Sequence, residues 1–318
     1  MKPITNIPTL EDIQRVHEAI KPYIHRTPVL SSKSINAIAG CEIYFKCENF
    51  QKVGAFKMRG ASSAVLALSE TERQKGIATH SSGNHAQAVA LSAKLQSIPA
   101  YIVMPENAPI IKFNATKGYG ATIFRSGNTI TEREEKLNEV LTKTDATFLH
   151  PYNNYDIIAG QATASKELHE DIEDLEVILA PIGGGGLMSG TALYTHYTKP
   201  HVTILGAEPK NVDDAFRSFH SGKVEINETI NTIADGLRTN LGNYTLEVIR
   251  KHVEDIITVE EEEIINAMRL IWERMKIIVE PSSAVPFAAV LQQKERFQGK
   301  KIGIIITGGN VDVERLPF

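Results

Sequence analysis

The chain has little of what marks a secreted, membrane-spanning or nucleic-acid-binding protein. Only two of its 318 residues are cysteines, Cys41 and Cys47. They lie on one predicted strand, where neither a disulfide between them nor a metal pair is expected, which favours a reducing, cytoplasmic location. No apolar run is long enough to cross a membrane, and the N-terminus lacks a signal-peptide pattern. No basic run is dense enough for a nucleic-acid surface, and the net charge is −4.

What the chain does have is an alternation of strand-like and helix-like segments. A helix capped by Thr9, with Asp12 in its first turn, is predicted to run through Tyr23. Strands are predicted at 76–80, 99–104, 121–125, 146–149, 176–180, 202–207 and 302–306. Helices are predicted at 84–95, 109–118, 131–143, 156–170 and 186–197, and from Glu260 and Pro281 onward. This alternation predicts an α/β fold with parallel sheets and helices on both faces, in a chain long enough for two lobes.

Lys57 occupies a position in which a lysine can become reactive. It follows a strand-like segment, 43–47, and a turn at Gly54, and it precedes a helix-like segment. The neighbouring Phe56 contributes to a setting that can lower the pKa of a lysine. A lysine that forms a Schiff base needs such a setting, because only the neutral amine is a nucleophile. A lysine before a helix is also common on protein surfaces, so the interpretation depends on three further segments.

These three segments are loops that follow other predicted strands. The loop 81–87, Ser-Ser-Gly-Asn-His-Ala-Gln, opens an alanine-rich helix, where N–H groups and hydroxyls can bind an anion. The loop 181–187 contains four consecutive glycines, which allow a phosphate to approach the backbone closely. The loop 307–310, Thr-Gly-Gly-Asn, follows a strand predicted to be buried. Each loop alone is compatible with a plain turn, but all four segments follow strands, at the sheet edge where open α/β folds bind ligands.

Together these segments resemble the fold-type II pyridoxal-phosphate enzymes, which include serine and threonine dehydratases, serine racemases, cysteine synthases and the tryptophan synthase β chain. The resemblance extends from about Pro28 to Asp312 and is nearest to serine racemases and hydroxyaspartate dehydratases. Ala55 stands where the family usually has serine, a variant associated with racemase and hydroxyaspartate dehydratase members. The resemblance implies an α/β fold of two lobes, with twisted, mostly parallel sheets flanked by helices as in tryptophan synthase β. The implied domains are a large cofactor-binding domain of residues 1–66 and 153–318 and a small mobile domain of residues 67–152.

The resemblance also implies how bound pyridoxal 5′-phosphate is used. Lys57 would hold the cofactor as a Schiff base and, once freed, take the Cα proton of a small β-hydroxy amino acid from one face. Ser82 would serve the opposite face, so one Cα carbanion leads either to racemisation or to loss of the β-hydroxyl and release of ammonia. The implied cofactor contacts are Phe56, Asn84, Gly183, Gly184, Gly185, Gly186 and Thr307. The implied substrate contacts are Ser81, Asn84, His85 and Arg133.

Acidic residues after the predicted strand 202–207 indicate a second site. Glu208, Asp214 and the backbone carbonyl of Val212 match the positions of a metal site in serine racemases. Oxygen donors of this kind suit Mg²⁺, Ca²⁺ or Mn²⁺. The alternative interpretation of the same residues is an acidic surface loop.

The resemblance to serine racemases further implies that ATP binds as an activator at the interface of a homodimer. Two positions of that nucleotide site depart from the family pattern, because Val53 replaces a threonine and Lys33 replaces a small hydroxyl residue. The positions that match are Lys52, Gln87, Lys112 and Tyr119.

Three interpretations of the function remain open at this stage. The first is a serine racemase with serine or threonine dehydratase activity, or a threonine or threo-3-hydroxyaspartate dehydratase with little racemase activity. The second is a β-replacement enzyme of the cysteine synthase kind. The third is a non-enzymatic module that binds pyridoxal phosphate or a nucleotide. The motifs do not distinguish serine, threonine and hydroxyaspartate, which differ by a methyl or a carboxylate group.

Overall fold

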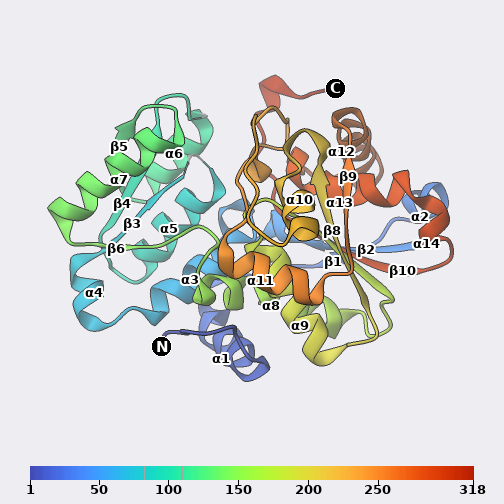
Figure 1. Cartoon of the computed structure of the whole chain (residues 1–318), viewed down its shortest axis with the longest axis horizontal. Coiled ribbons are helices and arrows are strands. Elements are labelled where there is room, and N and C mark those ends of the chain that lie inside the picture. Colours follow the sequence, from blue (N-terminus) through green and yellow to red (C-terminus); the bar gives the residue numbers. More distant parts are fainter. Residues whose placement is uncertain (82, 109) are drawn as a thin grey trace.

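Two β-sheets organise the chain in the computed structural model, which describes residues 1–81, 83–108 and 110–318 (Figure 1). The larger sheet has six strands in the order β1-β2-β10-β7-β8-β9. Among the described strands only β1 runs antiparallel to its neighbour. The strands are β1 (Val29–Leu30), β2 (Glu42–Cys47), β7 (Val177–Pro181), β8 (Thr203–Pro209), β9 (Asp255–Val259) and β10 (Lys301–Ile306).

The smaller sheet is built from a continuous part of the chain, residues 77–148, and lies apart from the larger sheet, at the left of Figure 1. Its four described strands are all parallel, in the order β5-β4-β3-β6. They are β3 (Ile77–His80), β4 (Ala100–Pro105), β5 (Thr122–Ser126) and β6 (Thr147–Phe148). The α/β fold class with mostly parallel sheets is therefore confirmed.

Helices cover both faces of the larger sheet, because its central strands are apolar on both sides. In β7, Ile178 and Ala180 face one hydrophobic core, whereas Val177 and Leu179 face the other. The helices are α1 (Leu10–Ile20), α2 (Lys33–Ala39), α3 (Lys57–Ala67), α4 (Glu70–Lys75), α5 (Asn84–Leu95), α6 (Ile110–Gly118), α7 (Ile130–Thr144), α8 (Tyr155–Asp171), α9 (Gly186–Thr198), α10 (Asp214–Ser221), α11 (Asn243–His252), α12 (Glu261–Met275), α13 (Pro281–Gln292) and α14 (Lys294–Phe297).

The first helix shows where the local prediction was right and where it was wrong. Thr9 caps α1 through a reciprocal capping box with Asp12, as the sequence predicts. The α-helix ends at Ile20, however, and a 3₁₀ turn, Lys21–Tyr23, replaces its predicted last turn. Pro22 in this turn has no N–H to continue the α-helical hydrogen bonds. The placement of both cysteines on one strand was also wrong, because Cys41 precedes β2 by one residue; both thiols are buried and free.

A buried ion network joins the start of α3 to the larger sheet and to α8. Arg59 is fully buried and donates from Nε to Glu48 Oε2 at 2.7 Å and from Nη2 to Glu167 Oε2 at 2.8 Å. Lys46, also fully buried, lies 2.7 Å from Glu167 Oε2. Burial alone would raise the pKa of Glu167, but hydrogen bonds from His17 and Arg59 lower it below its usual value. The network anchors Arg59, which stands two residues after Lys57.

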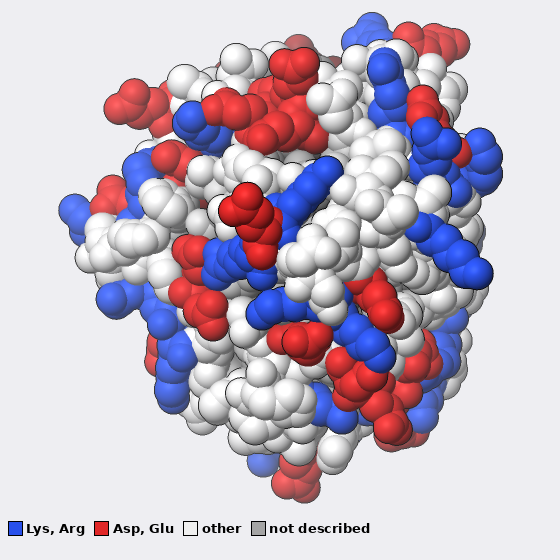
Figure 2. Space-filling view, turned by 90° about the vertical axis from the view of Figure 1, so that its right-hand side faces the viewer, with Lys and Arg blue, Asp and Glu red and all other residues white. Residues whose placement is uncertain are grey.

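The outer surface carries charges of both signs. Figure 2 shows Lys and Arg interspersed with Asp and Glu on the face it presents, without a broad area of one sign. None of the helices in the described ranges combines the length and apolar character that crossing a membrane requires.

Candidate active site

The four sequence segments converge at the carboxyl ends of the strands. The segment that holds Lys57 follows β2 and lies against the loop that follows β10, since these two strands are parallel neighbours. Phe56 N donates to Thr307 O at 2.9 Å, and Gly309 N donates to Gly54 O at 3.0 Å. An isolated bridge pairs Ala55 with Gly308. The first and last of the four motifs therefore form one continuous surface, although they are about 250 residues apart.

A hydrogen-bonded cluster joins the second motif to the same surface. Asn84, the first residue of α5, donates from Nδ2 to both carboxylate oxygens of Glu280, at 2.9 and 3.1 Å. Asn310 donates from Nδ2 to Asn84 Oδ1 at 2.9 Å and to Val53 O at 2.7 Å. Burial raises the pKa of Glu280 to about 7, although Lys112 and the hydrogen bond from Asn84 lower it. The cluster links α5, which lies between β3 and β4 of the smaller sheet, to the loop that follows β10 of the larger sheet.

Lys57 is the first residue of α3, and its amine lies in the centre of this region. Nζ donates to Pro151 O at 3.0 Å and lies 5.1 Å from the centre of the Phe56 ring. Burial lowers the pKa of Lys57 to about 8, against the opposing effect of the Glu280 carboxylate. A substantial fraction of this amine is therefore neutral near pH 8, which confirms the low-pKa setting predicted from the sequence.

The glycine loop after β7 has the space and the donors that a phosphate requires. A side chain on Gly184 would collide with the Tyr152 ring at about 2.2 Å, and Gly185 has a φ of +85°, which favours glycine. Gly185 is the N-cap of α9, a thirteen-residue helix without a side-chain cap. The amides of Gly183, Gly184 and Gly185 donate to no other residue within the described part of the chain. Free N–H groups at a helix N-terminus suit a phosphate, so this loop fits the phosphate of pyridoxal phosphate.

A hydroxyl pair lies at the end of β10. Thr307 is buried, and its Oγ1 is 2.9 Å from Ser283 Oγ. Ser283 Oγ in turn accepts from the amides of Thr307 and Gly308, each at 3.0 Å. The group that the structure offers here is a neutral hydroxyl, and a pyridine nitrogen beside it would lack the carboxylate that stabilises a pyridinium ion.

The predicted substrate contacts are only partly brought together. Ser81 Oγ accepts from Gly83 N at 3.2 Å, beside the start of α5. His85 is buried, and burial lowers its pKa well below the usual value, with Lys57 adding to the effect; its Nδ1 has no partner in the described structure. Arg133 lies on α7, and its Nη2 donates to Asn128 O at 2.9 Å. Within the described ranges no hydrogen bond joins Arg133 to Ser81, Asn84 or His85. Ser82 lies outside the described residues.

The predicted metal ligands are adjacent and buried, so the interpretation of an acidic surface loop was wrong. Glu208 accepts from the amides of Ala215 and Phe216 at 3.0 and 2.9 Å. Asp214 accepts from Asn227 Nδ2 at 2.5 Å and from Leu241 N at 3.0 Å. Burial raises the pKa of Asp214 to about 7, and burial together with Asp214 raises that of Glu208 well above its usual value.

This site contains two carboxylates and Val212, a buried residue of the 3₁₀ turn Lys210–Val212. Among the described residues no group of three or more Asp, Glu, His or Cys side chains could hold a metal. The predicted donor set of two carboxylates and one backbone carbonyl would therefore need water to complete it. Such a set fits a hard, oxygen-binding cation.

The four predicted nucleotide contacts are not joined to one another by a hydrogen bond or an ion pair within the described ranges. Lys112 Nζ instead donates to Asp235 Oδ2 at 2.5 Å, and this ion pair joins α6 to the 3₁₀ turn Asp235–Leu237 of the larger unit. Gln87 is buried on α5, while Lys52 and Tyr119 are partly exposed.

Sequence analysis missed several polar groups of the site. Two of them carried a local signal: Glu280 directly precedes the proline that starts α13, and Asn310 is the last residue of a predicted motif. The other missed residues carried no local signal in the sequence, because the role of each depends on a distant partner. The missed residues are His150, Pro151, Tyr152, Glu280, Ser283 and Asn310.

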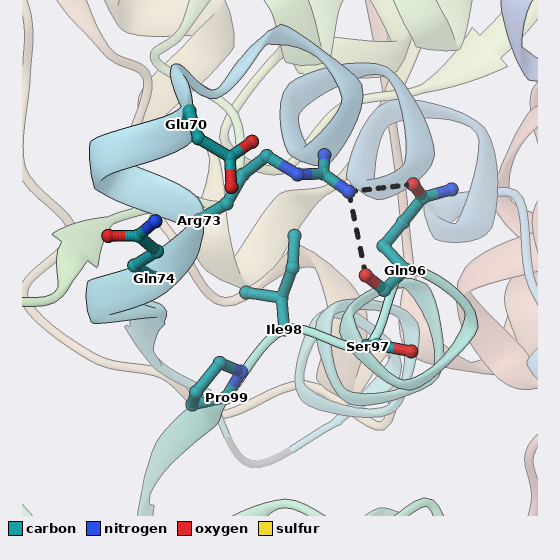
Figure 3. Close-up of a pocket in the computed structure, with 7 residues that line it drawn as sticks. All are labelled: Glu70, Arg73, Gln74, Gln96, Ser97, Ile98 and Pro99. Carbon is teal, nitrogen blue, oxygen red and sulfur yellow. Dashed lines mark hydrogen bonds between the residues drawn. The ribbon is translucent and has the colours of Figure 1, made fainter.

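A separate surface hollow is not part of this region. It lies on the smaller-sheet side of the molecule, between α4 and the turn after α5, where Arg73 donates to the backbone and side-chain oxygens of Gln96 (Figure 3). Its lining includes Ile98 and Pro99 but none of the predicted site residues. We therefore assign the chemistry to the convergent loops.

A lowered-pKa lysine, a glycine loop at a helix N-terminus and a parallel α/β sheet together define a pyridoxal-phosphate site. Residues 20–308 match the family described as pyridoxal-phosphate dependent enzyme, and the chain belongs to this family. Its relatives are lyases and isomerases that act on small amino acids, and the chain is an enzyme of this class.

Individual relatives are similar over nearly the whole chain. The serine racemase of Dictyostelium discoideum is 47% identical, covering 99% of this chain and 98% of the relative. The L-threo-3-hydroxyaspartate ammonia-lyase of Saccharomyces cerevisiae is also 47% identical, covering 97% and 95%. The crystal structure of maize serine racemase superposes with a TM-score of 0.94 at 46% identity, covering 96% of this chain and 94% of that one.

Proposed function

We propose that this enzyme racemises serine and removes ammonia from small β-hydroxy amino acids, including L-threo-3-hydroxyaspartate. The observation that carries the proposal is the lowered pKa of Lys57 at the meeting point of the four loops. The similarity to both a racemase and an ammonia-lyase supports the two outcomes. Threonine dehydration with little racemisation is the alternative within the same class.

The proposed roles follow from the contacts of each residue. Gly183 to Gly186 would hold the phosphate, Thr307 would face the pyridine nitrogen, and Asn84 and Phe56 would flank the ring. When bound, pyridoxal phosphate withdraws electrons from the substrate Cα and so acidifies its proton. Lys57 Nζ removes that proton from one face of Cα, and the Ser82 hydroxyl serves the other. The amide groups at the N-terminus of α5, including that of His85, would bind the α-carboxylate, with Arg133 approaching from α7.

The proposal is tested by giving the purified enzyme L-serine, L-threonine and L-threo-3-hydroxyaspartate side by side. Keto-acid release measures elimination, and the chirality of the remaining amino acid measures racemisation. We expect D-serine from L-serine and a keto acid from at least one of the three substrates. Formation of cysteine-like products from a thiol and an activated serine, without either activity, would instead indicate a β-replacement enzyme.

Replacing Ser82 with alanine should separate the two activities. Racemisation of L-serine needs a proton donor on the face opposite Lys57, so we expect it to be lost. Elimination from L-serine begins at the Lys57 face and should persist in part, whereas elimination from D-serine should fall with racemisation. The rates are measured by chiral chromatography and keto-acid assay. An equal loss of every activity would show that Ser82 binds substrate instead.

Glu208, Val212 and Asp214 are proposed to bind a structural and activating Mg²⁺, Ca²⁺ or Mn²⁺ ion. A cation would stabilise two carboxylates that burial otherwise penalises, and binding to the folded state would raise the melting temperature. Asp214→Ala should abolish the rise that added Mg²⁺ produces. Asp213→Ala is the matched control, because this neighbouring carboxylate pairs with Arg217 at 2.8 Å.

Thermal unfolding and activity are measured with chelator and with added Mg²⁺. Chelation should lower the activity of the wild type while the visible absorbance of the cofactor remains. If neither chelator nor Mg²⁺ changes the melting temperature or the rate of the wild type, the metal assignment is wrong.

We also propose a mobile small domain, residues 67–152, a homodimer and an ATP site that includes Lys52, Gln87, Lys112 and Tyr119. The ion pair between Lys112 and Asp235 would restrain movement of the small domain, because it joins the two units beside the candidate active site. Nucleotide phosphates would have to compete with Asp235 for the Lys112 amine.

A further inference from the structure

His150 lies on the segment that returns the chain from the smaller sheet to the larger one. The next residue, Pro151, provides the carbonyl oxygen that accepts from Lys57 Nζ at 3.0 Å. His150 Nδ1 accepts from the amide of Asn153 at 2.9 Å and from that of Tyr152 at 3.3 Å. A ring nitrogen that accepts hydrogen bonds carries no proton, so the neutral ring carries its proton on Nε2.

Aromatic residues pack against the His150 ring on two sides. Its centre lies 4.6 Å from that of Tyr152 and 5.7 Å from that of Phe148, both in edge-on geometry. Tyr152 in turn packs against Gly184 of the predicted phosphate loop. The ring is half-buried, and its Nε2 donates to no other residue within the described ranges. His150 therefore presents one fixed N–H donor that bonds to none of the described residues.

The surroundings of this donor are suited to an oxygen anion. Burial, together with smaller effects of His80 and Lys57, lowers the pKa of His150 to about 4. No carboxylate contributes to this shift. At neutral pH the ring is thus an uncharged donor near the Lys57 amine, and no described residue accepts a hydrogen bond from it.

We propose that His150 Nε2–H donates to the β-substituent of the substrate and favours substrates that carry a β-carboxylate, such as L-threo-3-hydroxyaspartate. The inference rests on the proposed function, because it concerns the side chain of a substrate whose Cα lies at Lys57. The amide groups at the N-terminus of α5, including that of His85, already offer donors for one carboxylate, and His150 supplies a donor for the second. A donor to a charged oxygen discriminates strongly against a substrate that lacks the oxygen.

Two substitutions separate this role from the capping of the 152–153 turn by Nδ1. In His150→Asn, the side-chain oxygen can take the place of Nδ1 and keep the cap, but the Nε2–H donor is lost. In His150→Gln, the amide nitrogen can take the place of Nε2 and keep a donor, but the cap is lost. If His150 only caps the turn, His150→Gln should be the more damaging variant. If His150 binds the substrate, His150→Asn should show a selective defect.

The experiment compares kcat/KM for L-threo-3-hydroxyaspartate and for L-serine in the wild type and both variants. In His150→Asn the loss for hydroxyaspartate should exceed the loss for serine by about 10- to 100-fold, the size expected for a hydrogen bond to a charged group. His150→Gln should keep most of the wild-type preference. Equal losses for the two substrates in His150→Asn would overturn the proposal, and so would a larger change of preference in His150→Gln.

A binding measurement distinguishes this inference from the proposed function. L-Aspartate and L-2-aminobutyrate differ by a carboxylate in place of a methyl, and their affinities are read from the change in visible absorbance of the cofactor. His150→Asn should weaken aspartate binding relative to aminobutyrate by a similar factor, and an unchanged ratio would contradict the role of His150. If the wild type turned over none of the substrates, the proposed function would be wrong, and this ratio would still decide the role of His150.

Discussion

Replacing Lys57 with alanine should abolish covalent attachment of pyridoxal phosphate and all turnover of amino acids. The wild-type chain, incubated with the cofactor and reduced with borohydride, should gain the mass of one reduced pyridoxal phosphate, and the variant none. Intact-protein mass spectrometry and visible absorbance measure this directly. We expect a loss of activity of several orders of magnitude, because both the attachment point and the base at Cα are removed.

The choice of Lys57 over other lysines follows from its surroundings. Burial lowers its pKa to about 8, which supplies neutral amine near neutral pH. The other lysines with a shifted pKa, Lys112, Lys210 and Lys301, are shifted upward, since each is paired with a carboxylate. Proton loss is harder for these lysines than for a lysine in water.

Lys94→Ala provides the control, because this exposed lysine lies in the last turn of α5, the helix that begins at Asn84. It should attach the cofactor as the wild type does. A Lys57→Ala chain that kept its yellow colour and a reducible link at another lysine would contradict the assignment.

Replacing Arg59 with alanine should cost about 3–5 kcal/mol of unfolding free energy, because it leaves buried carboxylates without their partner. Glu48 and Glu167 are both almost wholly inaccessible to solvent, and Arg59 donates two hydrogen bonds to each. Arg59 also stands two residues after Lys57, so its loss should disturb the start of α3. Urea unfolding of the cofactor-saturated chain measures the change.

Arg26→Ala is a matched control for the effect of burial. Arg26 also pairs with two carboxylates, Glu170 at 2.8 Å and Asp171 at 2.5 Å, but its side chain is half exposed. Solvent screens exposed pairs, so the expected cost is about 1 kcal/mol or less. Similar losses in Arg26→Ala and Arg59→Ala would show that the buried network is not the main anchor of α3.

Local features of the fold were predictable because their causes lie within a few residues. The capping box of Thr9 and Asp12, the start of α5 at Asn84 and the glycine loop before α9 all depend on neighbours in sequence. The strand β9 was missed, together with the amphipathic helices α10 and α11. These are short segments with mixed polar and apolar residues, and their packing against β8 and α9 decides their structure.

The α/β class, the order of the four loops and the place of Lys57 at the start of a helix could be predicted from the residues alone. These features were predictable because strand and helix periods, caps and glycine turns are local properties. Which polar groups meet depends on the tertiary structure, which brings Glu280 to Asn84 and Pro151 to Lys57. These partners are 196 and 94 residues apart in the sequence. The packing of the two sheets decides which of the many carboxylates and carbonyls comes within hydrogen-bonding distance. The burial that lowers the pKa of Lys57 arises from the same packing, so the reactivity of this lysine was indicated by the sequence but produced by the fold.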